Sequence, residues 1–178
     1  MGVSWCSAIS FLARWDRSTD SLHPSRWARG GRQGKVVKVT SLADNTSKGT
    51  LRYAATVETG PRTIVFDVGG VITLTSRLTV QGDYVTIAGQ TAPGKGIVIQ
   101  GWPLGLSGNK DAIVRHMRVR PGTVSGKTID GLGGAGVNHA IFDRCSTVSY
   151  ASCPWMAVWD YPTLGPRNLT ILSSGMGH

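Results

Sequence analysis

Short runs of alternating apolar and polar residues make up most of this chain, and Gly, Pro, Asn or Asp stands in nearly every gap between them. Such runs predict β-strands joined by tight turns. Residues 49–57 differ, because their apolar side chains recur at helical spacing and predict one short helix. Its expected apolar face consists of Leu51, Ala54, Ala55 and Val57. Strands are expected over residues 36–40, 63–68, 71–75, 78–81, 84–88, 96–100, 112–120, 139–142 and 168–172.

One phrase recurs along the chain, an Asn or Asp turn residue followed within three positions by an apolar strand. The turn residues, separated by 26, 29 and 30 positions, are Asp83, Asn109, Asn138 and Asn168. A period of about 20 to 50 residues indicates stacked units that bury their faces against one another. An antiparallel sandwich would show turn signals every ~8–12 residues, so the repeat favours a solenoid. Asn and Asp tolerate left-handed backbone, which we expect them to adopt at these bends.

Composition agrees with a β-rich protein. The chain has 178 residues, of which 24 are Gly, and Glu58 is its only glutamate. This balance disfavours long helices. The formal net charge of +9 attracts polyanions in general and does not distinguish a nucleic acid from an acidic polysaccharide or an anionic membrane. No segment reaches the roughly 18 apolar residues that a transmembrane helix requires.

The first 28 residues show no regular period, and we expect them to form a flexible leader ahead of one domain over residues 29–178. Residues 3–13 have the length of a signal-peptide apolar region, but neither a basic flank nor a clear cleavage site accompanies them. Three cysteines without a CxxC pair argue against a zinc site. Cys145 is expected to be a small buried residue, or to pair with Cys153 if their coils bring them close.

Three phrases of the chain resemble the N-terminal part of secreted pectate lyases and related polysaccharide lyases. They are Gly30-Gly31-Arg32-Gln33-Gly34, the stretch over residues 61–70, and Ile87-Ala88-Gly89-Gln90-Thr91-Ala92-Pro93-Gly94. The resemblance covers about residues 29–150. It implies an all-β, right-handed, single-stranded parallel β-helix with a helical N-terminal cap and about four coils, truncated relative to the family. It also implies secretion and cleavage of an acidic polysaccharide such as pectate by β-elimination, and disfavours nucleic acid as a partner.

The resemblance further implies a set of site residues. Such lyases typically use Ca²⁺ to neutralise the substrate carboxylate, and the matching positions name Asp143 and Asp130 as candidate metal ligands. A strand that ends in Arg-x-Arg places both arginines on one solvated face. The candidate substrate-binding residues are Arg115, Arg118, Arg120, Lys127 and Arg144.

The chain departs from the family pattern at two places. Arg144 replaces the histidine of an Asp-His pair, which favours an ion pair with Asp143 over metal coordination. Cys153-Pro154 replaces an Asp-Glu pair, and neither residue is a hard oxygen ligand. The catalytic base lies in later coils of the family, so we assign no catalytic residue and expect this chain to be inactive. The alternatives are a non-catalytic module that binds anionic glycans and a purely structural solenoid. An exposed last coil would favour self-association.

Overall fold

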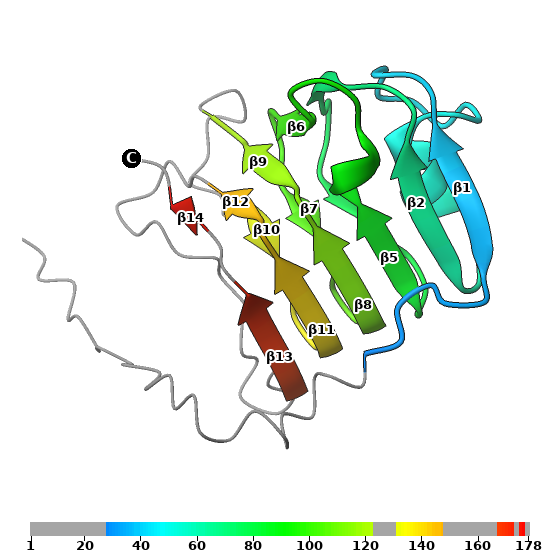
Figure 1. Ribbon diagram of the computed structural model, residues 1–178, viewed down its shortest axis with the longest axis vertical. Helices are drawn as coiled ribbons and strands as arrows, with labels where there is room; N and C mark the ends of the chain where they lie inside the picture. Colours follow the sequence, from blue (N-terminus) through cyan, green and yellow to red (C-terminus); the bar gives the residue numbers. More distant parts are fainter. Residues whose placement is uncertain (1–27, 123–130, 148–166, 173–174, 177–178) are drawn as a thin grey trace, which may run out of the picture.

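The strands of this protein are stacked in parallel, so that each sheet collects one strand from successive coils of the chain (Figure 1). The computed structural model describes residues 28–122, 131–147, 167–172 and 175–176. Sheet A contains β1 (Lys35–Val39), β2 (Arg62–Phe66), β5 (Val85–Ala88), β8 (Lys110–Arg115), β11 (Asn138–Asp143) and β13 (Arg167–Leu172). Sheet B contains β3 (Gly70–Thr73), β6 (Ile97–Gln100), β9 (Arg118–Arg120), β12 (Ser146–Thr147) and β14 (Gly175–Met176). Sheet C contains β4 (Leu78–Thr79), β7 (Leu104–Gly105) and β10 (Leu132–Gly133).

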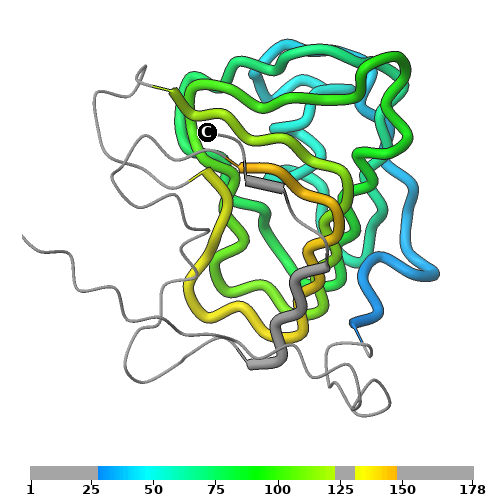
Figure 2. The backbone as a smooth tube through the Cα atoms, turned by 60° about the vertical axis from the view of Figure 1, so that its left-hand side comes forward, coloured from blue at the N-terminus to red at the C-terminus, as the bar shows by residue number. Residues whose placement is uncertain are grey.

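This arrangement confirms the expected parallel β-helix, with about 4 turns. Figure 2 shows the coils lying one upon another around a shared interior. Every expected strand is present, but the run over residues 112–120 forms two strands, because the backbone bends at His116, whose φ is 52°. The pattern missed β7, β10, β12 and β14, each of which has only 2 residues and is too short to show alternation.

The interior is built from columns of apolar side chains that occupy the same position in successive coils. Strand pairing aligns these residues, and each is at most 1 % exposed. Like side chains therefore stack along the axis, and each coil buries its face against the next. The column in sheet A consists of Ile64, Ile87, Val114 and Phe142, that in sheet B of Ile72, Ile99 and Val119, and that in sheet C of Leu78, Leu104 and Leu132.

The register of the coils differs by one residue from the repeat read in the sequence. Asn138 lies opposite Lys110 rather than Asn109, and opposite Arg167 rather than Asn168. The expected left-handed turn residues are also wrong. Positive φ values of 58°, 55° and 53° belong instead to Tyr84, Asp111 and His139. Hydrogen bonding between coils favours the left-handed backbone at Tyr84, since the Tyr84 N–H donates to the carbonyl of Lys110 in the next coil (2.9 Å).

A short helical segment, η3 (Tyr53–Val57), packs against β1 and β4 at the N-terminal end of the solenoid (Figure 1). It confirms the predicted helix, and Leu51, Ala54 and Ala55 are fully buried. Val57 is 48 % exposed, so its expected place on the apolar face is wrong. The η3 residues follow a wider turn than an α-helix, which rotates Val57 away from the core.

Residues 28–34, which we call the strap, cross the outer face of sheet A before the chain enters β1 (Figure 1). Arg29 N–H donates to Asp111 Oδ1 (3.1 Å) and Gly31 N–H donates to Thr86 Oγ1 (2.9 Å). The strap lies so close to the sheet that a Cβ at Gly31 would be 1.9 Å from the carbonyl oxygen of Arg62. The glycines of the first family-like phrase are therefore required by close packing of backbone on backbone.

Asp44 connects two coils near the helix. Its carboxylate accepts hydrogen bonds from Arg52 Nε (2.7 Å) and Nη2 (2.9 Å), and from the N–H (2.7 Å) and hydroxyl (2.8 Å) of Thr75. Burial by itself raises the pKa of Asp44, but the hydrogen bonds from Arg52 and Thr75 outweigh it and hold the pKa below its usual value. Asp44 therefore stabilises the fold in its charged form.

We expect Asp44→Asn to lower the free energy of unfolding by about 1–3 kcal/mol at neutral pH, because charge-assisted hydrogen bonds are lost. The unfolded carboxyl titrates near 3.9, above the folded value. The contribution is thus fully present above about pH 4 and disappears as the pH falls through the folded pKa. Urea unfolding between pH 7 and pH 3 should show the wild-type advantage shrinking with acid. If the difference in the free energy of unfolding between the wild type and Asp44→Asn stayed constant from pH 7 to pH 3, the charge of Asp44 would have no such role.

Candidate functional site

Four of the five basic residues predicted to contact substrate are described, and these four arginines lie around one corner of the solenoid. Arg115 ends β8 in sheet A, the chain bends at His116 and Met117, and β9 of sheet B follows. In β9 the predicted alternation is present, since Val119 is fully buried while Arg118 is exposed and Arg120 is half-buried. Arg118 and Arg120 therefore share the outer face of sheet B, and Arg115 belongs to the outer face of sheet A.

Arg120 is fixed to the next coil. Its Nη1 donates to the carbonyl of Ser146 (2.8 Å) and its Nη2 donates to the Ser146 hydroxyl (2.6 Å). Burial, followed by the nearby charge of Arg118, lowers the pKa of Arg120. Because the ordinary pKa of an arginine lies far above neutral pH, the side chain stays charged at neutral pH. The result is an oriented cation on the face of sheet B.

Asp143 ends β11 and lies directly opposite Arg115 in the strand register. Its Oδ2 is 3.3 Å from Arg115 Nε, and the side chains are 21 % and 46 % exposed. The sequence predicted an ion pair for Asp143, but with Arg144. Arg144 is instead exposed at the corner with a φ of 51°. The partner comes from the preceding coil because stacking, rather than adjacency in sequence, sets which charges meet.

The described residues do not fit calcium. Ca²⁺ takes six to eight oxygen ligands, usually from several carboxylates. Within the described part of the chain no group of three or more His, Cys, Asp or Glu side chains could hold a metal, and Asp143 is engaged by Arg115. The other predicted ligand, Asp130, and the predicted substrate contact Lys127 lie outside the described residues. We therefore derive no reaction step through calcium.

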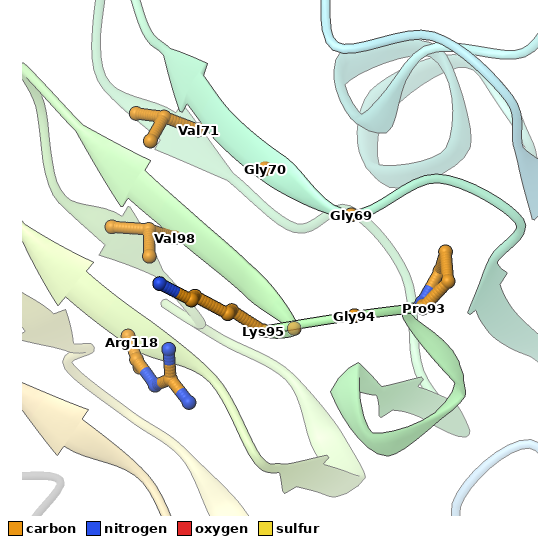
Figure 3. A pocket seen from close by; sticks show the side chains of 9 residues that line it. Gly69, Gly70, Val71, Pro93, Gly94, Lys95, Val98 and Arg118 are labelled. Atoms are coloured by element: carbon orange, nitrogen blue, oxygen red, sulfur yellow. The ribbon is translucent and has the colours of Figure 1, made fainter.

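A shallow groove lies at the edge of sheet B where its strands begin, between the start of β3 and the turn that precedes β6 (Figure 3). Four glycines, Pro93 and two valines form most of its lining, and Lys95 and Arg118 supply its charge. Sequence reasoning named Arg118 but missed Lys95. The available signal was the pair of phrases Gly69-Gly70 and Pro93-Gly94, which meet in this groove.

Cys145 is buried, as expected, and its thiol is free. Burial raises the pKa of this thiol above its usual value, so the group is poorly reactive. Its proposed partner, Cys153, lies outside the described residues. Across the segments that the structure describes, no helix has the length and apolar character needed to cross a membrane.

Comparisons with known proteins give a consistent set of relatives. No family model matches the chain. It is 45% identical over 119 residues to the probable pectate lyase C of Aspergillus flavus, and 46% identical over 119 residues to those of Aspergillus fumigatus and Emericella nidulans. Each alignment covers 67% of this chain and 27% of the relative, so the chain spans about a quarter of their length.

A solved structure supports the architecture. The crystal structure of Jun a 1, the major allergen from cedar pollen, matches 80% of this chain and 44% of its own, with a TM-score of 0.52 and 21% sequence identity. At that identity the likeness concerns the fold alone.

Proposed function

Since this chain is a relative of the pectate lyases, homologous to them over two thirds of its length, we propose that it derives from a secreted polysaccharide lyase acting on an acidic polysaccharide such as pectate. The observation that carries the proposal is the sequence identity of 45% over 119 residues. The exposed cation Arg118 and the oriented cation Arg120 support it, because a polyuronate chain carries a carboxylate on every sugar.

The reaction proposed for the lyase is a β-elimination. A base removes the proton on C5 of a uronate unit, the electron pair forms the C4–C5 double bond, and the glycosidic oxygen leaves from C4. The C5 proton becomes more acidic when the adjacent carboxylate is neutralised, which is a task that cations such as Arg118 and Arg120 perform. We assign the base to none of the described residues.

A second candidate is a glycan-binding module without lyase chemistry. The observation that favours it is the ion pair between Asp143 and Arg115, which occupies the one described carboxylate expected to hold calcium. The replacement of the family's Asp-Glu pair by Cys153-Pro154 points the same way. We propose that the chain by itself binds polygalacturonate without cleaving it.

The test is to incubate the purified 178-residue chain with polygalacturonate at alkaline pH, with and without millimolar Ca²⁺. We expect no rise in the ultraviolet absorbance of the 4,5-unsaturated uronate, but retention on immobilised polygalacturonate that decreases with salt. Calcium-dependent product would show that a complete lyase site exists in this chain. Absence of both product and retention from β-folded protein would contradict glycan binding and favour a structural solenoid.

A further inference from the structure

The groove on sheet B has a backbone that is held rigidly in place. The Gly70 N–H donates to the carbonyl of Gly96 (3.0 Å), and the Gly96 N–H donates to the carbonyl of Pro93 (3.2 Å). A Cβ at Gly69 would be 2.2 Å from the Pro93 oxygen, so the turn lies in direct contact with the start of β3. The groove is therefore formed before any ligand binds, which reduces the ordering cost of binding.

The floor of the groove continues onto an aligned row of side chains. Val71, Val98 and Arg118 lie opposite one another on β3, β6 and β9. Neighbouring strands are about 4.8 Å apart, so the row presents two apolar groups followed by a cation at regular spacing. Figure 3 shows the side chains of Lys95 and Arg118 extending over the same face as the two valines.

Both cations of the groove are available to a ligand. No hydrogen bond or ion pair engages the side chain of Lys95 or Arg118 within the described residues, and both are exposed. Arg118 Nη2 lies only 3.9 Å from the position that a Cβ at Gly96 would occupy, so its guanidinium borders the groove. The lining contains no acidic side chain, and the local charge is therefore positive and unopposed.

We propose that this groove is a docking subsite for an acidic oligosaccharide, in which Lys95 and Arg118 bind carboxylates and Val71, Val98 and the glycine backbone contact the sugar rings. A pyranuronate ring suits this lining because it carries apolar C–H groups on its face and a carboxylate at its edge. A single-stranded nucleic acid fits less well, since its bases stack on aromatic side chains and the lining has none. The inference rests on the proposed function, and adds to it a site and the residue Lys95.

The experiment measures the affinity of the whole chain for a short oligogalacturonate by calorimetry, at low and at physiological salt. The variants are Lys95→Met and Arg118→Met, with Lys110→Met as a matched control on β8, where Lys110 is exposed and outside the groove. Each groove variant should weaken binding about fivefold, as expected for one exposed charge contact, and the control should leave it unchanged. The methyl-esterified oligosaccharide, which keeps the rings but loses the charge, should bind weakly and equally to all variants.

Wild-type affinity in both groove variants would overturn the subsite, while leaving the proposed function intact if polygalacturonate is still retained. An oligonucleotide of equal charge that binds as tightly, and loses affinity with the same variants, would overturn the assignment to a saccharide. Failure of the folded wild-type chain to bind oligogalacturonate would overturn the subsite and the proposed glycan binding together.

Discussion

Replacing Arg62 with methionine is expected to lower the free energy of unfolding by about 4 kcal/mol, because it removes charged donors from two buried carbonyls at about 1.5–3 kcal/mol each. Arg62 is fully buried at the start of β2. Its Nε donates to the carbonyl of Ala54 (2.8 Å), and its Nη2 donates to those of Ala55 (3.0 Å) and Gln81 (2.6 Å). One side chain thus joins β2 to η3 and to Gln81, which follows β4.

Two effects oppose each other in this substitution. Burial lowers the pKa of Arg62 and makes its charge costly, so an apolar replacement relieves a desolvation penalty. The carbonyls of Ala54 and Ala55 belong to the helical segment and lose their charged donor while they remain inside the protein. We expect the second effect to dominate, because methionine can satisfy neither carbonyl.

Urea unfolding followed by circular dichroism measures this change, with Arg32→Met as the control. Arg32 is exposed on the strap, and its replacement should change the free energy by no more than about 0.5 kcal/mol. The loss in free energy of unfolding for Arg62→Lys should lie between zero and that for Arg62→Met, since one ammonium cannot reach all the carbonyls. Equal midpoints for Arg62→Met and the wild type would refute the proposed bridge.

Replacing Gly31 with alanine is expected to cost about 3 kcal/mol of stability by overpacking. A Cβ at Gly31 would lie 1.9 Å from the Arg62 oxygen and 2.2 Å from its carbonyl carbon. These are backbone atoms of a central strand and cannot move aside as a flexible side chain would. The strap must then lift, which breaks the bond from Gly31 N–H to Thr86 Oγ1 and uncovers Ile113, now 7 % exposed.

Gly108→Ala separates collision from backbone strain. Gly108 has a φ of +75°, and nothing lies within 4 Å of its added Cβ, so alanine there costs only the left-handed conformation, about 1–2 kcal/mol. Gly31→Ala should exceed this control in unfolding experiments and should also expose the strap to limited proteolysis. A smaller loss than that of Gly108→Ala, without increased cleavage, would mean that the strap tolerates a side chain.

The candidate site was only partly accessible from the sequence. Alternation alone placed Arg118 and Arg120 on one face, since Val119 between them had to point inward. Lys95 was not predicted, because it lies in the turn before β6. It is brought to the same groove as Arg118 only by the pairing of β6 with β9. The same holds for the pairing of Asp143 with Arg115, which depends on strand register. Lys127 and Asp130 remain predictions outside the described residues.

The amino-acid sequence by itself determined the class of this fold. Its short apolar runs, turn residues and repeat of nearly thirty positions favour a solenoid, because period and turn chemistry are local properties, and the three phrases that resemble the pectate lyases imply the parallel β-helix. The tertiary structure decided which residues meet across coils. The left-handed backbone lies at Tyr84, Asp111 and His139 rather than at the expected Asp83, Asn109 and Asn138. The tertiary structure likewise set the close approach of Gly31 to Arg62, since contacts between coils depend on strand register and packing distance, which no single segment encodes.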